Sequence, residues 1–393
     1  MLTSLPAVVV VGNHTQGLGI VRSAAVAGAA SWVVNDQHLS LVRFSRHLTG
    51  YRRLPHGTLS RLDQPASAAK LVAALLALPV KAPAVLLGVD EDITRFIHQQ
   101  RAQLAERFFI PALARDAIYD KHRFSELVPA SARIETWLWD DARVKQLTSP
   151  NLFVVKGRSG NRFRRVTGEK AIRLNDFIGE VREQVFRNLP PTEVVVQSLV
   201  CTGRPVTSVC AFSVRGEIKG LFGYEKLRQH PNQFGTGTYL RSVEVGFMRP
   251  VAETILRALE YTGISEIEFI HDDAAGCWRV IEMNLRTWKS VHFATQCGAN
   301  LVGQLLAQVA GQRVEQSEGY ARGKFWADFA TDLPQMWRDR TLHRYERGLS
   351  ECVWVRGDYG PGLGLCTLFP LMVLEQWWSR RAACAKVFAP PNS

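Results

Sequence analysis

Runs of β-branched and aliphatic residues alternate with helical spacing along the first hundred positions of the chain. Residues 7–11 (AVVVV) form one strand-like run, residues 20–30 have the spacing of a helix, and residues 31–36 (SWVVND) form a second run. Strands that alternate with helices in this way are typical of a parallel sheet covered by helices. We therefore expect an α/β domain at the N-terminal end.

Two segments that follow predicted strands contain glycines or acids. The first, GNHTQGLG at residues 12–19, matches neither GxGxxG nor a phosphate loop, and we interpret it as a tight turn before a helix. The second is the acidic cluster Asp90, Glu91 and Asp92, which follows a strand at residues 84–88. Ligand contact at a strand end and capping of the next helix both remain open for this cluster.

The pattern at residues 263–286, GISEIEFIHDDAAGCWRVIEMNLR, predicts a β-hairpin. Residues 267–270 form the first strand-like run, and residues 278–283 return as the second run. The intervening segment, residues 272–276, is rich in turn-forming residues.

Three polar side chains of this hairpin are candidate metal ligands. Because side chains alternate along a strand, Glu282 and Asn284 project from one face, and hairpin pairing can bring Glu268 opposite them. Two carboxylates and an amide oxygen suit Mg²⁺ held against phosphate oxygens. Arg286 continues the same row and could offset charge on a transferring phosphoryl group. The alternative is an exposed hairpin that carries ordinary surface charges.

The stretch VIEMNLR, residues 280–286, resembles the metal-binding strand of the ATP-grasp superfamily, usually written Glu-x-Asn-Pro-Arg. That superfamily includes biotin carboxylase, D-alanine–D-alanine ligase, carbamoyl-phosphate synthetase and the D-aspartate-ligase-like carboxylate–amine ligases. The resemblance covers roughly residues 8–312, and Leu285 replaces the common proline.

This resemblance implies an α/β (α+β) chain with the ATP-grasp fold and an N-terminal parallel-sheet domain. It divides the sequence into a pre-ATP-grasp domain at residues 1–105, an N-terminal ATP-grasp subdomain at 106–190, a C-terminal subdomain with the magnesium site at 191–312, and a C-terminal extension of unclear role at 313–393.

The resemblance also implies which residues bind ATP. Lys121, at the start of a helix, and Lys156, at the end of a strand, are expected to face the phosphates, a task that suits a compact point charge on a long stem. The strand at residues 192–200, TEVVVQSLV, corresponds to the hinge whose backbone contacts the adenine edge. The expected hinge residues are Gln197, Ser198, Leu199 and Val200.

The segment GRSGNRFRR, residues 157–165, lies where the superfamily has a glycine-rich flap over the phosphates. It contains four arginines and no acid. Among these arginines, Arg158 and Arg162 are expected to contact phosphate or a substrate carboxylate. A solvated basic loop is the alternative. We expect the loop to be mobile without ligand and to close over the γ-phosphate and the acid substrate.

Residues next to the hairpin are expected to act on the substrates. Lys226 and Arg228 end an alternating run, where similar ligases place a basic residue against the transferred phosphate or the substrate carboxylate. The resemblance therefore implies catalytic roles for Lys226 and Arg286. Trp288 and Ser290 follow the hairpin closely enough to line the acceptor pocket.

Composition excludes several other classes. The chain has 393 residues, 46% of them hydrophobic and 21% charged, which suits an enzyme of two or three subdomains. The seven scattered cysteines contain no CxxC pair, so they indicate neither a disulfide framework nor a zinc site, and we expect a cytoplasmic protein without a signal peptide. The formal charge of +12 fits a basic cleft for anions, because no nucleic-acid-binding motif accompanies it.

The C-terminal part is the least informative. Residues 359–374 carry no charge, but glycines and prolines interrupt them, so the stretch is too short and too broken for a membrane span. We expect it to pack on the catalytic core as a lid or a homodimer contact. Contact with a membrane surface, together with Trp377 and Trp378, is the alternative.

We therefore expect an ATP-dependent carboxylate–amine ligase. In the mechanism that the resemblance implies, a carboxylate attacks the γ-phosphate of ATP, and an amine then displaces phosphate from the acyl phosphate to give an amide or peptide bond. The expected cofactors are ATP and one or two Mg²⁺ ions, with Mn²⁺ as a substitute, and the expected partners are a small carboxylate and an amine but no nucleic acid. The alternatives are an ATP-grasp carboxylase or phosphotransferase acting on a small anion, a nucleotide-regulated binding protein, and a basic nucleic-acid-binding protein.

Overall fold

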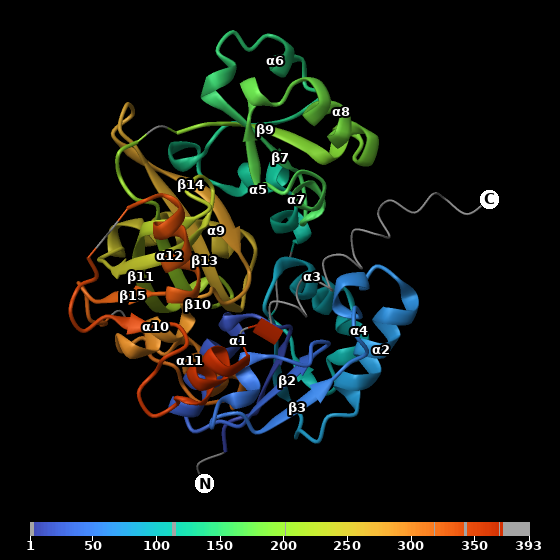
Figure 1. Cartoon of the computed structure of the whole chain (residues 1–393), viewed down its shortest axis with the longest axis vertical. Coiled ribbons are helices and arrows are strands. Elements are labelled where there is room, and N and C mark those ends of the chain that lie inside the picture. Colours follow the sequence, from blue (N-terminus) through green and yellow to red (C-terminus); the bar gives the residue numbers. More distant parts are fainter. Residues whose placement is uncertain are drawn as a thin grey trace.

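Three β-sheets organise the chain in the computed structural model, which describes residues 4–371 except 112–114, 201, 318, 342–343 and 369. A five-stranded sheet comes first along the chain, a four-stranded sheet second and a seven-stranded sheet last (Figure 1). Short 3₁₀ helices at Leu41–Phe44, Leu59–Arg61, Asp116–Tyr119, Ala130–Ala132, Pro150–Leu152, Leu174–Asp176, Pro191–Glu193 and Gly246–Met248 connect the larger elements.

The five-stranded sheet is parallel throughout, with the strand order β3-β2-β1-β4-β5. Its strands are β1 (Val8–Val11), β2 (Ser31–Asn35), β3 (Gly50–Arg53), β4 (Ala84–Gly88) and β5 (Phe108–Phe109), and its helices are α1 (Thr15–Val26), α2 (Pro65–Leu76), α3 (Glu91–Gln99) and α4 (Arg101–Leu104). All four valines of β1 are fully buried, because a central parallel strand has no solvent-facing side. The predicted N-terminal parallel sheet is confirmed.

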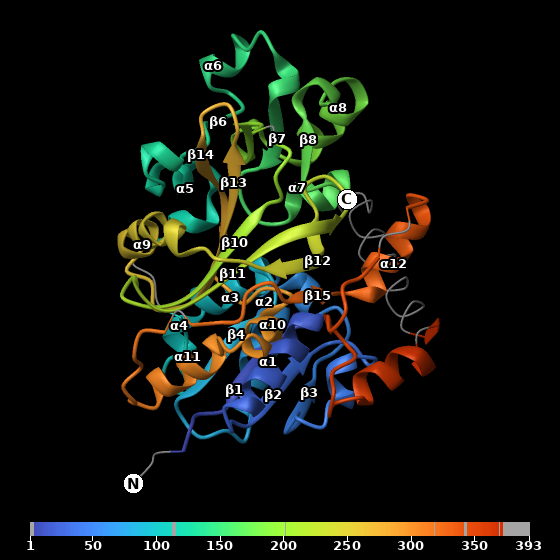
Figure 2. The same ribbon diagram turned by 90° about the vertical axis from the view of Figure 1, so that its left-hand side faces the viewer.

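The four-stranded sheet is antiparallel, with the order β6-β9-β7-β8. Its strands are β6 (Thr136–Leu138), β7 (Phe153–Gly157), β8 (Ala171–Arg173) and β9 (Val194–Ser198), and the helices of this region are α5 (Lys121–Leu127), α6 (Ala142–Lys145), α7 (Arg162–Thr167) and α8 (Gly179–Asn188). A small core of its own lies beneath it, formed by Val155, Phe163, Phe177, Val185, Leu189 and Val194. Figures 1 and 2 show this sheet projecting from the rest of the molecule.

The seven-stranded sheet has the order β14-β13-β10-β11-β12-β15-β16 and is antiparallel except where β15 meets β16. Its strands are β10 (Thr207–Val214), β11 (Glu217–His230), β12 (Thr236–Ser242), β13 (Gly263–Asp272), β14 (Cys277–Asn284), β15 (Phe325–Ala327) and β16 (Ser350–Glu351), and its helices are α9 (Arg249–Ala258), α10 (Val291–Gln296), α11 (Leu301–Val309) and α12 (Phe329–Arg338). The predicted hairpin is the β13–β14 pair.

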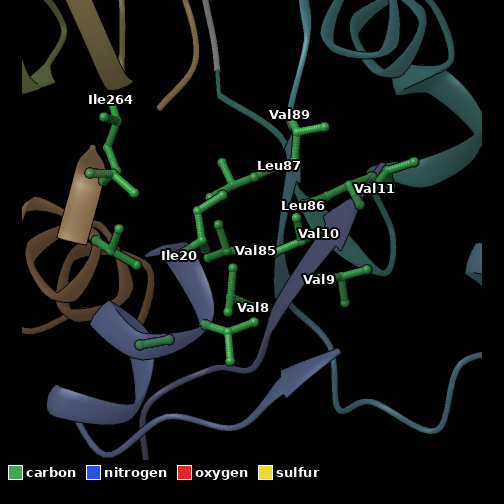
Figure 3. Packing of buried hydrophobic residues seen from close by; sticks show 14 of the residues in the cluster. Val8, Val9, Val10, Val11, Ile20, Val85, Leu86, Leu87, Val89 and Ile264 are labelled. Atoms are coloured by element: carbon green, nitrogen blue, oxygen red, sulfur yellow. The ribbon is translucent and has the colours of Figure 1, made fainter. Parts of the chain in front are cut away.

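The five- and seven-stranded sheets share one hydrophobic core. Helix α1 packs against α10 and α11, and Ile264 of β13 belongs to the same buried cluster as Val8 and Ile20 (Figure 3). The helices approach closely at Gly19, where a Cβ atom would lie only 2.9 Å from a side-chain carbon of Val291. These two sheets therefore form one packed body, whereas the four-stranded sheet has a core of its own.

The segment after residue 312 continues this body. Strand β15 pairs with β12, and α12 packs against β11 and β12 (Figure 2). Residues 360–368 are helical, and Gly360 and Gly364 lie against Phe44 of the N-terminal part. Residue 369 and residues 372–374 of the uncharged stretch, together with Trp377 and Trp378, fall outside the described residues. None of the helices in the described part of the chain has both the length and the apolar character needed to cross a membrane.

Arg22 of α1 and Asp358 form a buried clamp between the two ends of the described chain. The Nε atom of Arg22 lies 2.8 Å from Oδ2 of Asp358, and its terminal nitrogens donate to the carbonyl oxygens of Cys352 and Val353 at 2.8 Å each. Burial would raise the pKa of Asp358, but hydrogen bonds from Arg22 and Ser45 outweigh burial and hold it below its usual range. Both charged side chains of the clamp are almost completely buried.

We predict that Arg22→Ala lowers the free energy of unfolding by about 3–5 kcal/mol, because Asp358 would remain as a buried charge without its partner. Urea unfolding followed by tryptophan fluorescence measures the change. Arg143→Ala, which removes an exposed ion pair with Asp141, is the control and should leave the curve unchanged. An Arg22→Ala curve that overlays the parent would show that the clamp adds nothing to stability.

Candidate active site

The β13–β14 hairpin brings the two predicted carboxylates together. Glu268 of β13 pairs directly with Glu282 of β14. Across β10, the Nζ atom of Lys226 lies 2.6 Å from Oε1 of Glu268. Ser208, the residue of β10 opposite Glu268, is fully buried and small enough to leave room for this contact.

Lys226 and Glu268 influence each other's protonation. Burial would lower the pKa of Lys226, but Glu268 and Glu266 outweigh burial and raise it. Burial raises the pKa of Glu268, and the nearby carboxylates Glu282 and Glu266 add to that effect, although Lys226 opposes it. Lys226 therefore stays charged at neutral pH, and a cation beside Glu268 stabilises the ionised carboxylate.

Glu282 is the carboxylate that the lysines of the site surround. Within the described residues, no hydrogen bond or ion pair engages its oxygens. Burial would raise its pKa, but nearby positive charges outweigh burial and lower the pKa to about 2. Those charges belong to Lys170, Lys156, Lys226 and Lys121. Four lysines and Arg286 against Glu266, Glu268 and Glu282 still leave an excess of positive charge, which suits an anion such as a triphosphate.

Asn284 is oriented by two neighbours. Its Nδ2 donates to Oε2 of Glu266 at 3.0 Å, and its Oδ1 accepts from Nη2 of Arg286 at 3.1 Å. Glu266 also accepts a hydrogen bond from the hydroxyl of Tyr224, whose pKa burial raises well above its usual value. Glu266 was not among the predicted site residues. Its signal is its position two residues before Glu268, which places both acids on one face of β13.

The expected nucleotide hinge is built around Gln197. Its Oε1 accepts from Nζ of Lys156 at 2.7 Å, and its Nε2 donates to Thr136 at 3.1 Å. The N–H groups of Ser198 and Leu199 donate to backbone carbonyls at 3.0 and 2.7 Å. Because these two N–H groups are already paired, they are not the groups that contact an adenine edge in this conformation.

Two cavities in the described structure are each lined by some of the expected site residues. A small cavity of about 50 Å³ has Lys121, Gln197, Glu282, Asn284 and Arg286 in its wall. A larger cavity of about 670 Å³ has Leu199, Val200, Lys226 and Arg228 in its wall. The larger cavity falls within the size range of pockets that hold a nucleotide-sized ligand.

The arginine-rich segment differs from its prediction. Residues Arg162–Thr167 form helix α7, so the loop is shorter than expected. Nitrogens of Arg158 contact the carboxylate of Asp120 at 2.7 and 2.9 Å and the carbonyl of Thr192 at 3.1 Å. Arg158 therefore ties the end of β7 to the start of α5 instead of facing a substrate. Arg162 is exposed, with a weak 3.4 Å hydrogen bond to the Asn188 carbonyl.

Two acids at the start of α3, a helix of the five-stranded sheet, contact this loop and α7. The Gly160 N–H donates to Glu91 at 3.1 Å, and Nη2 of Arg165 lies 2.6 Å from Oδ2 of Asp92. Asp90 caps α3 by accepting from the Ile93 N–H at 2.8 Å. The acidic cluster therefore both caps a helix and contacts the loop. Arg165 has no acid within its own segment, and its partner Asp92 comes from a distant part of the sequence.

Trp288 and Ser290 lie inside the packed body. Trp288 is 2% exposed and stacks on Phe222, with ring centroids 6.5 Å apart. Ser290 is also 2% exposed. Neither side chain opens onto the two cavities described above, because the loop after Arg286 turns into the shared core.

The segment after β1 reaches the same loop from the N-terminal side. Gly12 has φ of 116°, a conformation that favours glycine, and α1 begins three residues later, as predicted for a tight turn. Gln16 donates to both the carbonyl and the hydroxyl of Thr287 at 2.7 Å. Desolvation within the cleft, with the charges of Lys289 and Arg286, lowers the pKa of His14 to about 4, so this imidazole is neutral.

Glu268, Glu282 and the amide oxygen of Asn284 offer the hard oxygen ligands that Mg²⁺ prefers. Within the described part of the chain, no three His, Cys, Asp or Glu side chains gather so as to hold a metal by themselves. Magnesium usually binds through one or two carboxylates together with substrate phosphates. The carboxylates would supply the protein side of such a site.

No protein-family model matches the chain, and no curated protein sequence matches it. Solved structures do match. N5-carboxyaminoimidazole synthetase from Staphylococcus aureus superposes with a TM-score of 0.59 at 14% identity, over 85% of each chain. Biotin carboxylase from Campylobacter jejuni, in complex with β-γ-ATP, gives 0.59 at 13% identity over 82% of this chain and 75% of its own. The L-amino acid ligase from Bacillus licheniformis gives 0.57 at 14% identity over 82% and 79%.

We predict that nucleotide affinity depends on the ionisation of Lys156. Burial lowers its pKa to about 8, although Glu282 opposes this effect. The ammonium is charged below that pH and loses its proton above it, so MgADP affinity should fall roughly tenfold between pH 7 and pH 9. Calorimetric titration measures the fall. Lys156→Arg keeps its charge over this range and should remove the pH dependence; the same slope in both proteins would contradict the assignment.

We also predict that Asp92→Asn loosens the loop at residues 158–161, because it removes the charged partner of Arg165. Hydrogen exchange read by mass spectrometry should show faster exchange in peptides that cover residues 158–167. Asp176→Asn, at an exposed acid of the same four-stranded region, is the control and should leave those peptides unchanged. Equal exchange in all three proteins would show that Asp92 does not restrain the loop.

Proposed function

We propose that this chain, which has the fold of biotin carboxylase and other ATP-grasp enzymes, is an ATP-dependent ligase that joins a carboxylate to an amine through an acyl phosphate. One observation supports the proposal most strongly. Glu282 has no partner within the described residues, and four lysines surround it opposite a second carboxylate, Glu268. An ordinary surface hairpin has no need for such a concentration of unmatched charge.

In this proposal the lysines bind the phosphates of ATP. Lys121 and Lys156 approach Glu282 from the four-stranded side, and Lys226 approaches from β11. Bound Mg²⁺ supplies charge neutralisation between the carboxylates and the phosphates. Lys170, which directly precedes β8, adds a fourth cation that the sequence analysis did not include.

Arg286 is the group that we assign to the transferring phosphoryl group. It lines the small cavity beside Glu282 and Asn284, and its Nη2 is held by the amide oxygen of Asn284. Its Nε is buried and has no hydrogen-bond partner among the described residues. A fixed cation with an unused donor can stabilise charge that develops during transfer without first reorganising.

The loop at residues 157–161 and α7 serve as the cover of the site in this proposal. They belong to the four-stranded sheet, whose core is separate from that of the body. Movement of this sheet toward the hairpin would exclude water from an acyl phosphate, which water otherwise hydrolyses. The loop is held at Gly160 and Arg165 by acids of the body, so closing or opening has to adjust those contacts.

A panel of acids and amines tests the function. Each carboxylate is offered with MgATP, with and without each amine, and ADP release is measured together with the mass of the products. ADP release that requires both a carboxylate and an amine supports the ligase. Release that requires bicarbonate in place of the acid would identify a carboxylase, and transfer of phosphate to a stable product would identify a phosphotransferase.

We predict that Glu282→Gln and Glu268→Gln each lower turnover by at least about tenfold to 100-fold, because each removes a charged oxygen ligand from magnesium. The loss should be greatest at limiting Mg²⁺, and circular dichroism should show a folded protein. Glu180→Gln on α8, an exposed acid of the four-stranded region, is the control and should keep the parent rate. Parent-like rates in both site variants at limiting Mg²⁺ would exclude the metal assignment.

A further inference from the structure

Two buried acids at the start of α12 pair with a cation of β11 and a cation of the loop after β14. Asp328 and Asp332 are four residues apart at the start of this helix, and they are 2% and 1% exposed. Asp328 pairs with Lys289, and Asp332 pairs with Arg228. Both acids lie beyond residue 312, outside the region that resembles the ATP-grasp superfamily. The following inference concerns Asp332 and rests on the proposed function.

Asp332 holds Arg228 through a two-pronged contact. The Nη2 atom of Arg228 lies 2.5 Å from Oδ2 of Asp332, and its Nε lies 3.1 Å from both carboxylate oxygens. This geometry fixes the plane of the guanidinium group as well as its position. Burial would lower the pKa of Arg228, but Asp332 outweighs burial and raises it, so the arginine stays charged.

Three further side chains complete the arrangement. Thr238 and Tyr345 donate their hydroxyl hydrogens to Asp332 at 2.6 and 2.5 Å, so the acid accepts hydrogen bonds at both oxygens. The guanidinium carbon of Arg228 lies 4.2 Å from the ring centre of Tyr239 and 5.0 Å from that of Tyr345. Aromatic faces on an arginine restrict its movement and add a cation–π attraction.

The backbone of β11 turns Arg228 toward this acid. The pairing of β11 with β12 shifts register on both sides of Arg228, between Lys226 and Arg228 and again before Gln229. Irregularities of this kind re-aim a side chain that a regular strand would direct elsewhere. A local distortion centred on Arg228 is therefore combined with a buried acid from a segment 104 residues away.

Arg228 nevertheless remains part of a cavity wall. The cavity of about 670 Å³ is lined by Lys226, Arg228, the hinge residues Leu199 and Val200, and Asp332 itself. Tyr345 also hydrogen-bonds the guanidinium group, and none of the hydrogen bonds assigned to individual nitrogens of Arg228 within the described residues involves the third nitrogen, Nη1. The guanidinium group of Arg22 differs, because all three of its nitrogens are used by Asp358 and three carbonyl oxygens.

We propose that Asp332 is a positioning residue that holds Arg228 so that its free Nη1 binds an anionic oxygen group in the larger cavity. The C-terminal segment, through Asp332, then contributes to the wall of the larger cavity and to ligand binding. The anion is a phosphate of the nucleotide or the carboxylate of the acid substrate, since both present oxygens in the geometry that a guanidinium group recognises. Because the Arg228–Asp332 pair is neutral as a unit, its contribution is the direction of a hydrogen bond more than net charge.

The test compares Asp332→Asn with Asp358→Asn in the full-length protein. Asp358→Asn is the matched control, because it weakens the other buried arginine–aspartate pair of the same C-terminal segment and lines neither cavity. Both variants should unfold at lower temperature than the parent. Only Asp332→Asn should also weaken ligand binding, by about tenfold or more, because an arginine that is free to rotate loses a directed hydrogen bond to a charged group.

Two measurements distinguish the possible anions. A rise in the Kd of MgADP by calorimetry identifies a nucleotide phosphate. An unchanged Kd for MgADP with a higher KM for the acid substrate, at similar kcat, identifies the carboxylate. Tyr345→Phe removes one hydrogen bond to Asp332 and should change the same constant in the same direction, to a smaller extent. This variant provides the test if Asp332→Asn does not fold.

The inference is overturned if Asp332→Asn and Tyr345→Phe change neither constant more than Asp358→Asn does. Its failure differs from failure of the proposed function. If the panel finds no ligase reaction but the parent binds MgADP, then MgADP and inorganic phosphate are the probes, and unchanged Kd values for both in the variants overturn the inference. If the parent binds neither probe, the larger cavity is not an anion site and both proposals fail.

Discussion

The Nζ atom of Lys226 lies 2.6 Å from Oε1 of Glu268 across β10, and the other charged groups of the site are arranged around this ion pair. A carboxylate removed from water is costly unless cations and hydrogen-bond donors surround it. Glu266 accepts hydrogen bonds from Tyr224 and Asn284. Only the positive charges of nearby lysines stabilise the ionised form of Glu282. Glu282 therefore has no direct partner among the described residues of the protein. A metal ion with phosphates has the charge and the ligands to fill that role.

Local patterns allowed much of this arrangement to be predicted. The β13–β14 hairpin and the facing of Glu268 and Glu282 follow from alternation along two short strands, and the parallel sheet follows from alternating strands and helices. The short strand β5 and helix α7 were not predicted. A strand of two residues has no period, and α7, which carries three arginines, lacks a clear apolar face.

Contacts between segments that are distant in sequence also could not be predicted from local patterns. Arg158 was expected to face a substrate, but Asp120 pairs with it, and nothing in the local sequence marks that partner. Trp288 was expected at a pocket wall, and its burial depends on how α1 and α10 pack. Asp332 is visible in the sequence only as an acid four residues after Asp328. Its role depends on the fact that β15 adds to the sheet edge beside β12.

The separate core of the four-stranded sheet also bears on how the site can close. Its loop contacts the body at Glu91 and Asp92, next to a helix of the parallel sheet, while its lysines approach Glu282 on the seven-stranded sheet. A single rigid movement of this sheet therefore changes distances to both other sheets at once. Any ligand that draws the lysines inward also acts on the contacts with the acidic cluster.

The clamp between Arg22 and Asp358 has a consequence for synthesis of the protein. The two residues are separated by 336 positions, so at roughly 5–20 residues per second α1 leaves the ribosome on the order of 20–70 s before its partner is made. Helices α10 and α11, which cover α1, also arrive late. During that interval α1 lacks the helices that later cover its outer face, and a chaperone that shields this face during translation would act on the step at which the nascent chain is most prone to aggregate.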